Sequence, residues 1–157
     1  MFLSTKTYTH DVGLSCAFRQ WRATHSHCCK LHGYAVQIGF KFAAHELDDK
    51  GWVTDFGGLK ELKAELVNTF DHKTVVAKDD PELEWFMEAQ RRGIMDVVVM
   101  EPGVGCERFA QFAFNVASRI IDEKYGDRVW VVECEVREHG GNSAIYTGES
   151  AVGAVMD

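Results

Sequence analysis

Residues 34–42 alternate strictly between large apolar side chains and small or polar ones. The apolar members are Tyr34, Val36, Ile38, Phe40 and Phe42, and the residues between them are Ala35, Gln37, Gly39 and Lys41. Because successive side chains of a β-strand point to opposite faces, this pattern predicts a strand with one buried face. The rest of the chain must therefore supply a layer that covers that face.

Three segments have the spacing of amphipathic helices, namely 58–70, 81–92 and 107–123. In the third, the apolar residues form one continuous stripe, and Gly126 supplies a stop. Strands are predicted at 14–21, 95–100, 129–138 and 143–147 in addition to 34–42. This order of elements predicts an α+β fold with helices packed on one face of an antiparallel sheet. We expect one domain over residues 1–147 and a short, flexible tail over 148–157.

The composition excludes several classes of protein. Lys and Arg number 17 against 24 Asp and Glu, a net charge of −7, which argues against a nucleic-acid partner. No apolar run approaches the roughly 20 residues that a membrane-spanning helix needs, so no membrane partner is expected. Five cysteines at irregular spacing suit reduced thiols and predict a cytoplasmic protein.

Three of the seven histidines, His25, His27 and His32, lie within eight residues and beside Cys28 and Cys29. Two histidines separated by one residue can face the same way on an extended segment, which suits chelation of zinc. A cysteine close to a histidine can instead become a thiolate that acts as a nucleophile or a base. The alternative is a histidine-rich surface loop that carries ordinary thiols.

Carboxylates supply the other candidates. Asp71 precedes His72 and can orient its ring, although neighbours in sequence need not meet and a surface dipeptide is the alternative. Glu107 begins the third helix, where the helix dipole favours an acidic residue in any case. Glu138 is expected to end a buried row formed by Trp130, Val132, Cys134 and Val136. A carboxylate there can bind adjacent N–H donors of a heterocycle such as pterin or guanine, or form a salt bridge with Arg137 or another basic residue.

Five short motifs, in order over about residues 14–147, resemble those of the 6-pyruvoyl-tetrahydropterin and 6-carboxy-tetrahydropterin synthases. They are Cys28–Gly33, Gly51–Lys60, Phe70–His72, Val136–Glu138 and Ala144–Tyr146. The resemblance implies a tunnelling fold (T-fold), assembled as a homo-oligomeric ring or pair of rings with sites between subunits. It also implies a pterin substrate, with Cys28 as general base, Asp71 and His72 as its relay partners, and Glu138 as the anchor of the pterin ring. Glu107 stands where the family has a further glutamate that contacts the substrate.

The chain departs from this family at the zinc site. Family members bind zinc through a histidine of the first strand and both histidines of a His-Gly-His segment, and the matching positions here are Phe18, His32 and Tyr34. The family's Pro-Thr-x-Glu segment is Val104-Gly105-Cys106-Glu107 here, and the threonine after the anchoring glutamate is His139. Zinc in this chemistry would polarise oxygens of the substrate side chain. A relocated zinc site formed by His32, His27 and His25 is therefore a hypothesis.

The leading hypothesis is a lyase similar to 6-carboxy-tetrahydropterin synthase that acts on a dihydropterin triphosphate, in the route to pterins or to queuosine-type deazaguanines. The alternative is a metal-free ring assembly that binds a pterin or a purine without catalysing that reaction. Phe18 and Tyr34 favour the alternative, because aromatic rings at the ligand positions suit stacking on a heterocycle. The third hypothesis is an oligomer with a purely structural role that only retains the pocket of the family.

Overall fold

The structure of the protein, a computed structural model, describes residues 1–148. Most of the predicted tail, residues 149–157, lies outside the described residues. The chain forms seven strands and three α-helices in an α+β arrangement. In chain order these are β1 (Phe2–Tyr8), β2 (Leu14–Phe18), β3 (His32–Ala44), α1 (Lys60–Phe70), β4 (Lys73–Ala77), α2 (Leu83–Arg91), β5 (Asp96–Met100), α3 (Cys106–Tyr125), β6 (Val129–His139) and β7 (Asn142–Tyr146).

Strand β3, the segment with the strict alternation, is the centre of the sheet. One of its edges pairs antiparallel with β2, where Phe18 lies opposite His32, and further along with β1, where Tyr8 lies opposite Ile38. Its other edge pairs antiparallel with β6, and β7 pairs antiparallel with β6 in turn. The predicted α+β class, with an antiparallel sheet at its centre, is confirmed.

Two strands, β1 and β4, were not among the predicted ones. Strand β4 pairs parallel with β2 and β5 pairs parallel with β4, so one side of the sheet is mixed. Strand β4 is a short run that is buried at four of its five positions, and such a run cannot be told from the end of a helix by periodicity. In β1 only Tyr8 is fully buried, so the apolar alternation that marks a strand is weak there.

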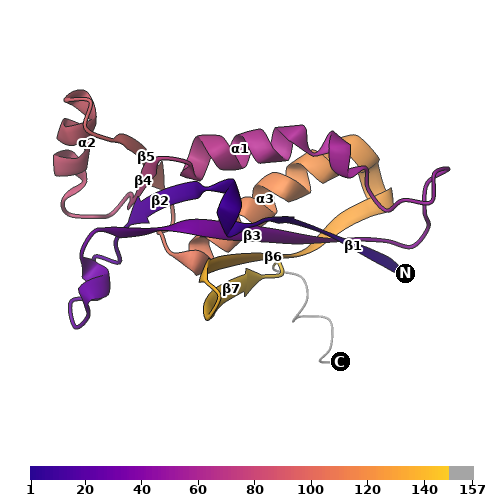
Figure 1. Cartoon of the computed structure of the whole chain (residues 1–157), viewed down its shortest axis with the longest axis horizontal. Coiled ribbons are helices and arrows are strands. Elements are labelled where there is room, and N and C mark those ends of the chain that lie inside the picture. Colours follow the sequence, from indigo (N-terminus) through magenta and orange to yellow (C-terminus); the bar gives the residue numbers. More distant parts are fainter. Residues whose placement is uncertain (149–157) are drawn as a thin grey trace.

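Helices α1 and α3 lie side by side on one face of the sheet, whereas α2 stands at the end formed by β4 and β5 (Figure 1). The loop between β2 and β3 projects beyond the sheet at that same end (Figure 1). Within residues 1–148, no helix is both long enough and apolar enough to cross a membrane.

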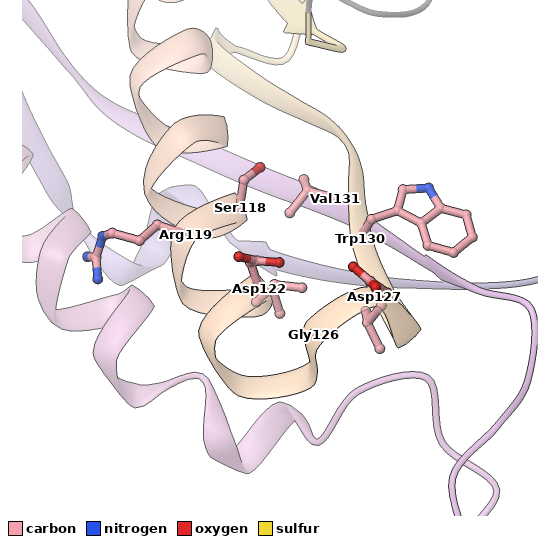
Figure 2. Close-up of a pocket in the computed structure, with 9 residues that line it drawn as sticks. Ser118, Arg119, Asp122, Gly126, Asp127, Trp130 and Val131 are labelled. Atoms are coloured by element: carbon pink, nitrogen blue, oxygen red, sulfur yellow. The ribbon is translucent and has the colours of Figure 1, made fainter.

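Strand β6 contains a bulge that corrects one prediction. Lys41 pairs with Glu133 and Phe42 pairs with Val131, so Val132 is an extra residue on β6. The inward alternation shifts by one residue there, and Trp130 and Val132 do not share the buried face of Cys134. The indole of Trp130 projects away from α3, at the mouth of a hollow of about 510 Å³ between α3 and β6 (Figure 2). Beyond the bulge, the predicted row continues through Cys134 and Val136.

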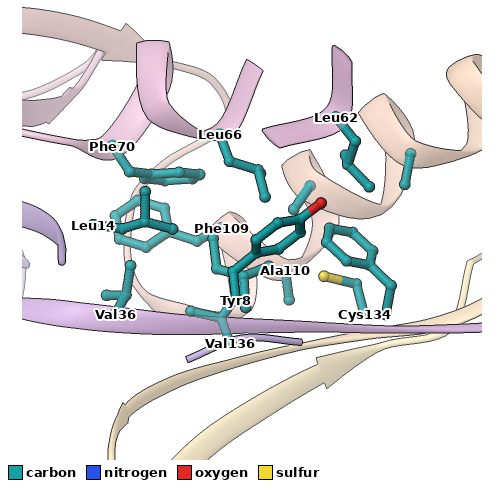
Figure 3. Close-up of a cluster of buried hydrophobic side chains, with 14 of the residues drawn as sticks. Tyr8, Leu14, Val36, Leu62, Leu66, Phe70, Phe109, Ala110, Cys134 and Val136 are labelled. Atoms are coloured by element: carbon teal, nitrogen blue, oxygen red, sulfur yellow. The ribbon is translucent and has the colours of Figure 1, made fainter. Parts of the chain in front are cut away.

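The core lies between the helix-facing side of the sheet and the two long helices (Figure 3). Phe70 of α1 and Phe109 of α3 meet edge to face, with ring centroids 5.1 Å apart, and both are fully buried. Small residues at successive turns of α3, Ala110 and Ala113 among them, are also fully buried. This core ends where α3 begins, and the same sheet face continues past it as the wall of the candidate site.

Candidate functional site

The candidate site lies where β2, β3 and β6 extend past the first turn of α3. Phe18 and Tyr34 lie on the sheet face that carries the core, because Phe18 pairs with His32 and Cys16 with Tyr34. Glu138 continues the inward row of β6 onto this face. Cys106, the first residue of α3, lies against Glu138. The ends of β2, β3 and β6 therefore meet the N-terminus of α3 at this site.

Three rings converge there, and we call Phe18, His32 and Tyr34 the aromatic cluster. Their ring centroids are 5.5 Å apart for Phe18 and His32, 5.6 Å for His32 and Tyr34, and 6.3 Å for Phe18 and Tyr34. Phe18 is only 2% exposed and is held edge-on by Phe109 at 5.0 Å. The ring of His139 lies 6.2 Å from that of Tyr34 and extends the cluster toward β6.

The aromatic cluster occupies the three positions at which the sequence resemblance places zinc ligands. Three imidazoles bound to one zinc at about 2.0 Å would have ring centres about 5 Å apart, so the backbone still presents three rings at nearly that spacing. The donor set does not fit zinc, because Phe18 has no donor atom and only His32 offers an imidazole. One imidazole and one phenol do not make a zinc site.

The relocated zinc site stays a prediction. His25 and His27 are exposed in the loop between β2 and β3, and His32 Nδ1 lies 2.7 Å from the carbonyl oxygen of Lys30. Within the described part of the chain, residues 1–148, no three His, Cys, Asp or Glu side chains are grouped as metal ligands. The three histidines would have to be brought together by a rearrangement of that loop.

Glu138 lies at a second irregularity of β6. Arg137 pairs with Ser143 and His139 pairs with Asn142, so Glu138 is the extra residue of the strand. Bulges re-aim a side chain next to many active sites. Arg137 pairs with Glu135 rather than with Glu138, so the alternative of an Arg137–Glu138 salt bridge is wrong.

Cys106 is a functional-site residue that the sequence reasoning did not single out. Burial, followed by the charges of Glu138 and Glu107, raises the pKa of its thiol to about 12. The thiol is therefore neutral at physiological pH and lies against Glu138. The only signal in the sequence is its place next to Glu107, at the unspecified position of the Pro-Thr-x-Glu segment.

Glu107 is exposed in the first turn of α3, and its charge reaches the Cys106 thiol. The turn before it is held by Gln20, whose side-chain amide donates to the carbonyl oxygen of Val104 at 2.6 Å. Gly105 has a φ of 107°, and a Cβ there would lie 2.2 Å from Gln20 Nε2. Glycine at this position therefore lets the loop after β2 lie directly against the start of α3.

The two adjacent thiols face different surroundings. Cys28 and Cys29 lie in a short 3₁₀ turn over His27–Cys29. Burial, followed by the charge of Glu138 and then that of Cys28, raises the pKa of Tyr34, which indicates that Cys28 lies on the side of the aromatic cluster. Cys29 instead lines a hollow of about 460 Å³ beside Arg19. Which of the two thiols is reactive stays a prediction.

The loop that carries Cys28 is anchored by a buried ion pair. Arg19 donates to both carboxylate oxygens of Asp80, at 2.8 and 2.6 Å, and Asp80 is 4% exposed. The same guanidinium donates to the carbonyl oxygen of Cys29 at 3.3 Å. Asp80 follows β4, the strand that pairs with β2, so this pair ties the Cys28 loop to the neighbouring strand.

The Asp71–His72 pair forms as predicted but stands apart from Cys28. Asp71 Oδ1 and His72 Nδ1 are 2.6 Å apart, and the His72 side chain is 83% exposed. The backbone N–H of His72 donates to the carbonyl oxygen of Ser15, whereas Cys28 lies beyond the Phe18 end of the same strand. Phe18 is three positions along the strand from Ser15, which is roughly 10 Å, so one chain does not bring Cys28 and His72 together.

Comparisons with known proteins agree with this architecture. The family model described as 6-pyruvoyl tetrahydropterin synthase matches residues 7–149. A 6-carboxy-5,6,7,8-tetrahydropterin synthase of Rickettsia conorii is 35% identical over 57 residues, which cover 36% of this chain and 41% of that relative. The alignment thus spans about two fifths of that curated relative. A putative 6-carboxy-5,6,7,8-tetrahydropterin synthase of Methanocaldococcus jannaschii is 25% identical over 135 residues, covering 78% of this chain and 82% of the relative.

Solved structures show the same fold. An uncharacterized protein of Wolinella succinogenes superposes with a TM-score of 0.80 at 17% identity, covering 94% of this chain and 98% of the other. The 6-pyruvoyltetrahydropterin synthase of Plasmodium vivax superposes with a TM-score of 0.64 at 16% identity, covering 93% and 98%. These similarities establish the tunnelling fold predicted from the motifs.

Proposed function

The chain belongs to the 6-pyruvoyl tetrahydropterin synthase family, and from that premise we propose that it is a lyase similar to 6-carboxy-tetrahydropterin synthase, acting on a dihydropterin triphosphate. The observation that supports this most is that Tyr34, the Glu138 end of β6 and the Cys28 loop come together at one end of the sheet. The ring of Tyr34 lies 6.2 Å from that of His139, next to Glu138, and the backbone N–H of Gln20, just past β2, donates to the carbonyl oxygen of Cys28. A base, a hydroxyl donor and a carboxylate anchor around one place suit a heterocycle with a reactive side chain.

In this proposal Glu138 accepts hydrogen bonds from adjacent N–H groups of the pterin ring. A carboxylate presents two acceptor oxygens, which match two neighbouring donors and fix the ring in one orientation. The neutral thiol of Cys106 lies against Glu138 and would help to keep it in position. Glu107, exposed at the rim, would contact the substrate from the other side.

Cys28 is the proposed base that removes a proton from a carbon of the pterin side chain. The exposed Asp71–His72 pair would shuttle that proton, and because it is remote from Cys28 of its own chain, we infer that it serves Cys28 of a neighbouring subunit. Sites between subunits of a homo-oligomer follow from this arrangement. We also propose that the protein works in the cytoplasm, where its five free cysteines stay reduced.

Turnover of dihydroneopterin triphosphate, followed by mass spectrometry, tests the proposal. Wild-type protein should convert it, Cys28→Ala should abolish conversion, and Cys29→Ala, the matched control next to it, should retain most of it. Binding without conversion by the wild-type protein would refute the lyase.

Mixing two inactive variants tests the shared site. Cys28→Ala and His72→Ala proteins, dissociated and reassembled together, should regain about a quarter of wild-type activity if each site draws on two neighbouring subunits. No recovery, from a mixture that has demonstrably exchanged subunits, would show that Cys28 and His72 of neighbouring subunits do not form one site.

A second candidate function is a pterin- or purine-binding ring assembly without lyase activity. The aromatic cluster favours it, because the positions of the zinc ligands hold rings that can stack on a heterocycle but cannot polarise a substrate oxygen as a metal does. The same turnover experiment separates the two, since this candidate predicts binding with no product.

A further inference from the structure

The rings of the aromatic cluster are spaced like the three ligands of a metal site, but they do not supply three metal-binding atoms. Its centroid separations of 5.5 to 6.3 Å are only slightly longer than the roughly 5 Å expected of three imidazoles on one zinc. The nonpolar ring of Phe18 is fixed between His32 and Phe109. What the cluster offers to a ligand is therefore an apolar wall, one imidazole and one phenol hydroxyl.

The phenol of Tyr34 is the group best placed to act on a ligand. Tyr34 is half-buried, and its ring lies 5.6 Å from that of His32 and 6.2 Å from that of His139, the neighbour of Glu138. A ligand anchored by Glu138 and approached by Cys28 must thus pass close to that hydroxyl. A neutral hydroxyl can donate one hydrogen bond to a ligand oxygen, which is the electrostatic help that a metal would otherwise give.

We propose that the Tyr34 hydroxyl donates a hydrogen bond to a side-chain oxygen of the bound pterin, and that this site works without a divalent metal. The ligand class is a pterin with an oxygenated side chain on its ring, and the proposal rests on the proposed function. Tyr34 acts here as a specificity-determining residue: it recognises the side chain, whereas Glu138 recognises the ring.

A comparison of two ligands tests whether Tyr34 recognises the side chain and Glu138 the ring. Neopterin carries a hydroxylated side chain and pterin has none, so the two differ only in the part assigned to Tyr34. Tyr34→Phe should weaken neopterin binding about 3- to 10-fold, as expected for one lost hydrogen bond, and leave pterin binding unchanged. Glu138→Gln should weaken both ligands alike. Tyr146→Phe, another half-buried tyrosine, which packs on Phe114 at 5.2 Å, is the matched control and should change neither.

Metal content gives a readout that does not depend on activity. Wild-type protein purified from zinc-supplemented medium should hold less than about one zinc per ten chains, and a chelator should leave neopterin binding unchanged. The Phe18→His/Tyr34→His double variant should take up close to one zinc per chain, because it completes three imidazoles at the required spacing. If burial of a polar ring at position 18 prevents folding of the double variant, the zinc content of the wild-type protein still tests whether the site works without a metal.

The outcomes separate the two proposals. If wild-type protein binds neither ligand, the proposed pterin function is overturned. If it binds both and Tyr34→Phe affects neither or both equally, only the role of Tyr34 is overturned. Stoichiometric zinc that is lost on His27→Ala, with loss of neopterin binding, would establish the relocated site of His25, His27 and His32 and overturn the metal-free proposal.

Discussion

Asp80→Asn should destabilise the protein by about 2–4 kcal/mol, although Asp80 lies outside the candidate site. Asp80 is 4% exposed and accepts two hydrogen bonds from Arg19 and a third, at 2.9 Å, from the backbone N–H of Glu82. A hydrogen bond to a charged group contributes about 1.5–3 kcal/mol, and removing one partner of a buried ion pair costs about 3–5 kcal/mol. Asparagine keeps the shape and one acceptor oxygen, which places the loss toward the lower part of that range.

The loss should depend on pH in a defined direction. Although burial opposes it, the Arg19 guanidinium and the Glu82 amide hold the pKa of Asp80 below its ordinary value. A carboxyl group with a lowered pKa stabilises the folded state fully above its unfolded pKa, about 3.9 for Asp, and loses that contribution as the pH falls through the folded pKa. The difference between wild type and Asp80→Asn should thus be constant from pH 7 to pH 5 and shrink below about pH 4.

Urea unfolding followed by tryptophan fluorescence measures this difference, at one fixed protein concentration because assembly adds to apparent stability. In thermal unfolding at pH 7, the Tm of Asp80→Asn should lie about 5–12 °C below that of the wild type for a chain of this size. Asp79→Asn is the matched control, because Asp79 pairs with Arg22 at a similar 2.9 Å but with its side chain 52% exposed. A difference that is equal for the two variants, or that persists unchanged at pH 3, would refute the reasoning.

Three further predictions follow from the packing around the site. Gly33→Ala should misplace the aromatic cluster and lower pterin affinity at least tenfold in a binding titration, because its Cβ would lie 2.5 Å from the backbone oxygen of Cys16; normal affinity would contradict this. A thiol reagent at pH 8 should label Cys28 quickly and Cys106 hardly at all, since the pKa of the Cys106 thiol is raised to about 12; peptide mass mapping checks the order. Phe109→Ala should cost about 3–5 kcal/mol in urea unfolding, because this fully buried ring supports both the core and the site.

The sequence alone was enough for the elements whose signal is local. The alternation at 34–42 identified β3, and the apolar stripe after residue 106 identified α3, because one buried face imposes its period on the chain. The order of short motifs was enough to indicate the family and its fold. Strand β4 was not predicted, because its parallel partners β2 and β5 are distant in sequence and its five residues show no alternation of apolar and polar side chains.

The tertiary structure alone decided which side chains meet. A one-residue bulge at Val132 shifted half of β6 to the other face, and no local pattern predicts where a ladder admits an extra residue. The meeting of Cys106 with Glu138, the separation of Cys28 from Cys29, and the distance between Cys28 and His72 are likewise set by strand register and by the docking of α3. Secondary structure depends on neighbours along the chain, whereas a site depends on contacts between segments that the sequence leaves far apart.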